Sequence, residues 1–163
     1  MTTILFFIVA FIAAAVPFTP HWLKIKNLIE VGDERTLKTY FKYLEDAELI
    51  RMVMKGTKKM YKIESPEKIY LNNTNQLYAL SANAQNIGTV RETFFLSAVS
   101  FLHKVGIPNA GDFIIDGETV FEIGGKNKDF KQIHDHANGY LVCDGLELGI
   151  GKKIPLWLFG FLY

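Results

Sequence analysis

The feature that most restricts the fold is a predicted β-hairpin in residues 111–128, with the sequence GDFIIDGETVFEIGGKNK. Two apolar runs flank an Asp-Gly pair there, and this arrangement is a strong hairpin signal. A three-residue loop, 116–118, would set Asp112 against Glu122, and opposed residues of antiparallel strands share a face. A two-residue loop would instead place the two carboxylates on opposite faces.

Asp112 and Glu122 would then lie together at the open end of this hairpin. Carboxylate oxygens are hard ligands, and two of them on one face suit a divalent cation such as Mg²⁺. The sequence therefore predicts a Mg²⁺ site. The alternative is an ordinary hairpin in which Glu122 simply faces solvent.

An acidic residue, an apolar hairpin and Glu-x-x-x-Lys, in this order, resemble the PD-(D/E)XK nuclease fold. The wider chain resembles the C-terminal half of a prokaryotic AAA+ ATPase family. The matching stretches include residues 40–50 (YFKYLEDAELI), 91–95 (RETFF), 121–128 (FEIGGKNK) and 154–163 (IPLWLFGFLY).

The resemblance implies an α/β (α+β) fold in two domains. Residues 1–66 would form a winged helix-turn-helix domain. Residues 67–163 would form a restriction-endonuclease-like domain, in which helices flank a mixed sheet.

The resemblance also implies roles for particular residues. Asp112 and Glu122 would bind Mg²⁺, and Lys126 would orient the attacking water in a metal-assisted hydrolysis of phosphodiesters. Glu92 would point toward the site from a helix, and Gln132 would face it. An alternative role for Glu92 is to stabilise the N-terminal end of its helix.

The chain departs from the family pattern in two respects. Nucleases of this fold carry a lysine two residues after the glutamate, where this chain has Gly124, and the nearest following lysine is Lys126. A Gly124-Gly125 pair favours a bulge or turn that would re-aim Lys126. The ATPase half is also absent, and no stretch matches the phosphate-binding GxxxxGK[ST] pattern. We therefore expect this chain alone not to bind ATP, and an ATPase domain in cis or trans to be a partner.

The first part of the chain is basic. The net charge of the whole chain is +1, but residues 21–63 contain ten Lys and Arg against six Asp and Glu. Predicted helices at 23–30 and 34–47, followed by a predicted hairpin at 49–63, indicate a helix-turn-helix with a basic wing. The residues expected to contact DNA are Arg35, Lys38, Thr39, Lys42, Lys55, Lys58 and Lys59. The alternative is a solvated face on a structural spacer or protein-contact module.

Residues 4–18 are fifteen consecutive apolar residues and imitate a signal peptide. The three residues before them carry no positive charge, and fifteen residues are too few to span a bilayer. We therefore expect a buried helix and a cytoplasmic protein without membrane contact, with a signal or anchor as the alternative. The single cysteine, Cys143, excludes an internal disulfide and is interpreted as a small buried residue in a strand.

Five further expectations concern the second half. Residues 68–71 should form a strand of the hairpin's sheet, a helix should cover 88–104, and another helix should begin at 129. The aromatic run 157–162 should be interior. The closely spaced His134 and His136 have no third ligand nearby in sequence, and we interpret them as exposed.

Two functions are compatible with these patterns. The first is a nucleic-acid-associated, nuclease-like module of an AAA+ family ATPase, catalytically weak or inert. The alternative is a non-catalytic winged-helix protein that binds DNA or regulates a partner.

Overall fold

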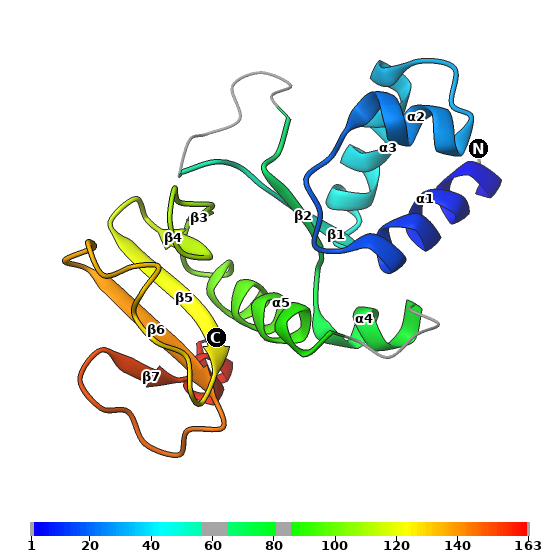
Figure 1. The fold of residues 1–163 in the computed structure, drawn as a ribbon. Helices are drawn as coiled ribbons and strands as arrows, with labels where there is room; N and C mark the ends of the chain where they lie inside the picture. The colour runs from blue at the N-terminus through cyan, green and yellow to red at the C-terminus, as the bar shows by residue number, and fades with distance from the viewer. Residues whose placement is uncertain (1, 57–64, 81–85, 163) are drawn as a thin grey trace.

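A computed structural model describes residues 2–56, 65–80 and 86–162 and shows a mixed α/β chain (Figure 1). The helices are α1 (Thr2–Ala15), α2 (Trp22–Ile29), α3 (Glu34–Asp46), α4 (Thr74–Leu80), α5 (Ile87–Val99) and the 3₁₀ helix η1 (Leu156–Phe161). The strands are β1 (Ile50–Val53), β2 (Lys68–Leu71), β3 (Val105–Gly106), β4 (Phe113–Ile115), β5 (Thr119–Gly125), β6 (Gly139–Asp144) and β7 (Lys153–Pro155).

The first three helices share a core with the two-stranded sheet. The apolar N-terminal run forms α1, as expected, and its Ile8 and Ile12 are fully buried, whereas Phe6 and Phe7 remain exposed. Among residues 2–56, 65–80 and 86–162, no helix has both the length and the apolar character that crossing a membrane requires. One face of α1, with Ile8 and Ile12, therefore packs in the core that it shares with α2 and α3.

Helix α3 is amphipathic and begins at a side-chain cap. Its apolar residues recur every three or four positions and bury one stripe, Leu37, Phe41 and Leu44. Asp33 accepts a hydrogen bond from the Thr36 N–H at 2.8 Å and so caps the helix at the predicted start, residue 34. The predicted start of this helix is thus confirmed.

We expect Asp33→Ala to lower Tm by about 2–4 °C, measured by circular dichroism, because it leaves the Thr36 N–H without its acceptor. Asp33→Asn keeps the acceptor and should change Tm by less than about half as much. Equal losses from both variants would show that the cap does not stabilise α3.

Strand β2 does not join the larger sheet, so that expectation was wrong. It pairs antiparallel with β1, with Ile50 opposite Leu71 and Val53 opposite Lys68. The reason is its alternation, because Ile69 and Leu71 pack in the core of α1–α3 whereas Tyr70 packs in the core beneath α5. One strand therefore serves both predicted domains. The second strand of the expected wing, 58–63, lies outside the described residues.

The five-stranded sheet has the order β3-β4-β5-β6-β7 and is mixed, as predicted. The pairs from β3 to β5 are antiparallel, and those from β5 to β7 are parallel. The hairpin register sets Ile115 opposite Thr119, which confirms the three-residue loop. In this loop Asp116 and Gly117 have φ values of 53° and 80°, left-handed conformations that an Asp-Gly pair tolerates.

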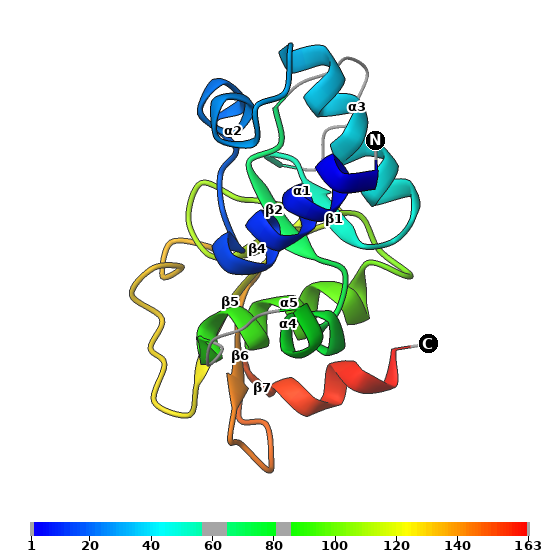
Figure 2. The ribbon, with the colours of Figure 1, turned by 90° about the vertical axis from the view of Figure 1, so that its right-hand side faces the viewer.

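Different segments of the chain cover the two faces of this sheet (Figures 1 and 2). Helix α5 and η1 lie on one face, where Phe95 packs against Phe113, Phe121 and Phe159. Residues 126–138 cover the other face and contribute Ile133 to its core. The sheet is therefore buried on both faces in its centre.

Three expectations about this half were wrong in detail. Helix α5 ends at Val99 and does not reach 104. No helix begins at 129, because successive i to i+3 hydrogen bonds, such as Ile133 N–H to Phe130 O, form separate turns. In η1 the three-residue period turns only every third side chain inward. Trp157 and Phe161 are consequently 50% and 66% exposed.

Candidate functional site

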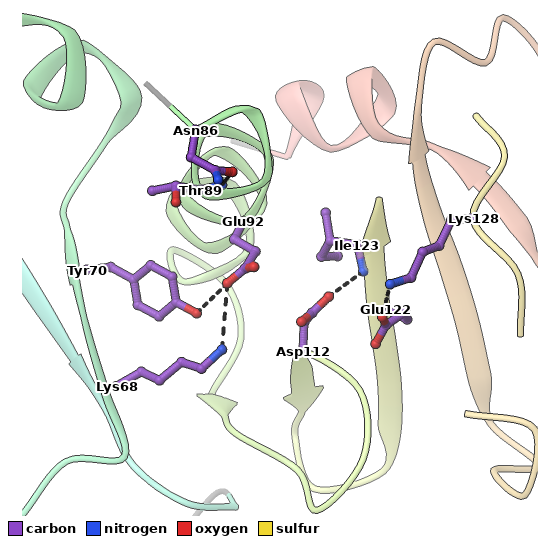
Figure 3. A network of polar contacts seen from close by, with 9 residues as sticks. All are labelled: Lys68, Tyr70, Asn86, Thr89, Glu92, Asp112, Glu122, Ile123 and Lys128. Atoms are coloured by element: carbon purple, nitrogen blue, oxygen red, sulfur yellow. Dashed lines mark hydrogen bonds and ion pairs between the residues drawn. The ribbon is translucent and has the colours of Figure 1, made fainter. Parts of the chain in front are cut away.

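Asp112 lies beside β5 and forms hydrogen bonds on both sides of Glu122. Its N–H donates to the Phe121 carbonyl at 3.0 Å, and its Oδ2 accepts from the Ile123 N–H at 2.7 Å (Figure 3). The backbone pairing of β4 with β5 ends at Phe113 and Phe121, and the Asp112 side chain adds one more hydrogen bond between the two segments. The three-residue loop thus places Asp112 at the open end of the hairpin, between its hydrogen bonds to Phe121 and Ile123 on either side of Glu122.

Glu122 is a buried carboxylate on β5, with its residue only 1% exposed. The ammonium of Lys128 contacts its Oε1 (Figure 3). The Gln132 amide also lies against it, and with its nitrogen turned to the carboxylate it donates to Oε2 at 2.9 Å. Burial with these partners rules out the alternative in which Glu122 simply faces solvent.

The lysine at this carboxylate is Lys128, and Lys126 is exposed beyond the end of β5. After Gly125 the chain turns, and the Lys128 N–H donates to the Gly125 carbonyl at 3.0 Å. This turn points the Lys128 side chain back along β5 (Figure 3). Of the predicted catalytic residues, Gln132 lies against Glu122, and Asp112 bonds to the backbone of the next residue, Ile123. Lys126 is exposed and forms no ion pair with Glu122 among the described residues.

Glu92 faces the same region from α5. Its Oε2 accepts a hydrogen bond from the Tyr70 hydroxyl at 2.7 Å and lies 3.8 Å from the Lys68 ammonium (Figure 3). Both partners come from β2, so this strand fixes the helix carboxylate. The predicted orientation of Glu92 toward the site is compatible with this geometry, and Tyr70, which donates the hydrogen bond, is fully buried.

Burial raises the pKa of the carboxyl groups of Glu92, Asp112 and Glu122 above their ordinary values. The charge of Asp112 adds to this effect at Glu92, and it also raises the pKa of Glu122, where the hydrogen bond from Lys128 opposes the rise. At Asp112 itself, the Ile123 N–H, Lys68 and Lys128 partly offset the burial. Burial alone would lower the pKa of Lys128, but Glu122 and Asp112 raise it. The site therefore favours bound positive charge.

A cation site with three protein ligands is not formed: the part of the chain that the structure describes contains no group of three or more His, Cys, Asp or Glu arranged to hold a metal ion. Mg²⁺ differs from tightly caged metals, since it commonly uses one or two carboxylates together with water and substrate phosphates. The pair of Asp112 and Glu122 fits that second pattern. Binding in the absence of substrate should then be weak.

Three residues that the sequence analysis missed complete the site: Lys128, Tyr70 and Lys68. The sequence contained a signal for the first, because two adjacent glycines leave room for a returning side chain from a nearby lysine. It contained none for the other two, because their approach depends on the pairing of β2 with β1.

The expected DNA-contacting residues are only partly available. The Lys42 ammonium lies 3.0 Å from Asp46 and 3.1 Å from Glu45. The hydrogen bond to Asp46 contributes most to raising the pKa of Lys42, and the bond to Glu45 adds to it. Lys38 lies 3.9 Å from Glu34 and over the Trp22 ring, and the Thr39 hydroxyl donates to the Arg35 carbonyl at 2.9 Å. Arg35 and Lys55 are exposed, whereas Lys58 and Lys59 lie outside the described residues.

The remaining candidates have structural explanations. His134 is exposed and lies 3.0 Å from Asp135, and His136 is half-buried; within the described residues neither belongs to a metal-binding cluster. Cys143 is fully buried in β6, which confirms its interpretation as a small core residue.

Comparison of the chain with protein families, curated proteins and solved structures found no match.

Proposed function

We propose that this chain is a nucleic-acid-associated, nuclease-like module whose carboxylate site binds Mg²⁺ and hydrolyses phosphodiesters weakly. The observation that carries the proposal is that Asp112, at the open end of an antiparallel hairpin, accepts a hydrogen bond from the Ile123 N–H, next to the buried Glu122, which contacts a lysine ammonium. Such a combination of paired carboxylates and a cation is typical of metal-assisted hydrolysis. The winged-helix and endonuclease-like folds, and the ATPase domain as partner, belong to the same proposal.

In this proposal Asp112 and Glu122 would hold the cation, with the Ile123 carbonyl as a further oxygen ligand. Mg²⁺ in such a site supplies charge neutralisation at the phosphate and lowers the pKa of bound water. The protein residues have separate tasks. Lys128 holds Glu122 in place, and the Ile123 N–H orients Asp112. Tyr70 and Lys68 orient Glu92 at the side of the site.

The non-catalytic DNA-binding alternative has less support. In α3, Lys38 and Lys42 lie near carboxylates of their own helix, so a phosphate would have to compete for them. Exposed pairs of this kind are weak, and competition is feasible but lowers affinity. We therefore expect any DNA binding by this surface to be non-specific and salt-sensitive.

The test is the Mg²⁺ dependence of thermal stability. With Mg²⁺ at about ten times its Kd, the folded wild type should gain about 1.4 kcal/mol, which is about 3–5 °C in Tm. Asp112→Asn should abolish this gain because it removes the charged ligand. Asp135→Asn, the same change at a side chain that is 85% exposed, should retain it. Cleavage of single-stranded and duplex DNA is measured in parallel.

Without Mg²⁺, Asp112→Asn should raise Tm, and the sign follows from its pKa. A carboxyl whose folded-state pKa is raised loses stability as the pH rises from its ordinary value of about 4 through the folded-state value. The advantage of asparagine should therefore be absent near pH 3.5 and largest at neutral pH, at about 2–4 °C for each kcal/mol. A wild type whose Tm does not respond to Mg²⁺, or an equal response in Asp112→Asn, would contradict the metal site.

A further inference from the structure

Lys128 reaches Glu122 from outside the strand that carries this glutamate. The turn after Gly125 reverses the direction of the chain, and the Lys153 ammonium on β7 donates to the Lys128 carbonyl at 3.0 Å. The backbone of Lys128 is thus held by a side chain from β7. Its far end meets a carboxylate that is almost fully buried.

The stem of Lys128 passes through the space above Gly124. A Cβ on residue 124 would lie 2.8 Å from Lys128 Cγ and Cδ and 2.9 Å from Lys128 Cβ. Real Cβ atoms do not approach carbon this closely, so a side chain at 124 and the observed Lys128 exclude each other. Residue 124 shares a face with Glu122, since it is two positions further along the strand.

Gly125 differs from Gly124 in this respect. A Cβ on Gly125 would lie 3.5 Å from the guanidinium nitrogens of Arg91, which is an ordinary van der Waals contact. Of the two adjacent glycines, Gly124 is therefore the one whose missing side chain makes room for a basic residue, and that residue, Lys128, ends on a site carboxylate.

We infer that Lys128 is the lysine of this site, brought by the turn after β5 into the space that a side chain on residue 124 would occupy, and that residue 124 is glycine to admit it. Lys128 is a positioning residue, because it acts through Glu122. Its effect on cleavage rests on the proposed function. Its occupation of the space above residue 124 does not.

The test moves the lysine to residue 124. Lys128→Met should reduce kcat for Mg²⁺-dependent DNA cleavage about 100-fold, the usual cost of misplacing a group in a site, with KM changed less. Lys128→Arg should retain more activity than Lys128→Met. The relocated variant Gly124→Lys/Lys128→Gly should recover at least about a tenth of the wild-type kcat. Gly124→Met/Lys128→Gly, the matched control without an ammonium, should not recover.

Two single variants complete the set. Gly124→Lys alone should be impaired, because its stem collides with that of Lys128. Lys131→Met, a change at a lysine whose side chain is 85% exposed, should keep the wild-type rate. A larger loss from Lys126→Met than from Lys128→Met would overturn the inference. So would a relocated lysine that performs no better than methionine.

A second readout distinguishes failure of the inference from failure of the proposed function. If the wild type cleaves no DNA, the proposed hydrolysis is wrong, but thermal unfolding still tests the placement of Lys128. In the Lys128→Gly background, lysine at 124 should give a Tm at least about 2 °C above methionine at 124. Adding Glu122→Gln should remove this advantage. Equal Tm values with Glu122 intact would show that a side chain at 124 does not reach the carboxylate.

Discussion

Phe95→Ala should lower the free energy of unfolding by about 3–5 kcal/mol, the largest loss that we expect from one substitution in this chain. Phe95 is fully buried, and its ring centroid lies 5.6 Å from that of Phe113, 5.2 Å from that of Phe121 and 4.7 Å from that of Phe159. One side chain thus joins α5 to β4, β5 and η1. Removing it leaves a cavity that three separate elements would have to close.

For a chain of this size the loss corresponds to about 6–20 °C in Tm, measurable by calorimetry or circular dichroism. The control is Phe101→Ala, just beyond the end of the same helix, where the residue is 81% exposed. It should change stability by less than about 0.5 kcal/mol. A small effect of Phe95→Ala would mean that η1 does not pack on α5 as described.

Lys128→Met should be the second most destabilising change, at about 3 kcal/mol near neutral pH, because it leaves a buried carboxylate without its ammonium. The pKa of Glu122 is already raised by burial, and removal of Lys128 should raise it further. The loss should therefore grow as the pH rises above about 4.5 and should be small at lower pH, where the glutamate is neutral in both states.

Urea unfolding from pH 4 to pH 8 measures this dependence. The double variant Glu122→Gln/Lys128→Met removes both charges and should be more stable than Lys128→Met alone at pH 8. If Lys128→Met lost the same stability at every pH, its contribution would come from packing over Gly124 and not from the ion pair.

Local signals in the sequence predicted the hairpin. An Asp-Gly pair between two apolar runs indicates a turn, and the loop length then fixes which residues oppose each other. The sequence left loops of two and of three residues open, and the pairing of Ile115 with Thr119 decides for three. The start of α3 was also predictable, because its cap acts within one turn of helix.

Long-range pairing could not be predicted in the same way. The four residues of β2 read as a strand, but nothing in them chooses between the five-stranded sheet and β1. That choice depends on which core receives Ile69 and which receives Tyr70. The site lysine was missed for a related reason, because Lys126 is the nearest lysine in the sequence, whereas the turn after Gly125 brings Lys128 back to Glu122.

Strand β2 contributes residues to two hydrophobic cores, and this has a consequence for how movement passes along the chain. Ile69 and Leu71 are anchored among the N-terminal helices, and Tyr70 between them holds Glu92 at 2.7 Å. A displacement of α1–α3 would therefore move Tyr70 and disturb the hydroxyl that donates to the carboxylate of Glu92. Movement of the N-terminal helices would in this way change the charge environment of the site.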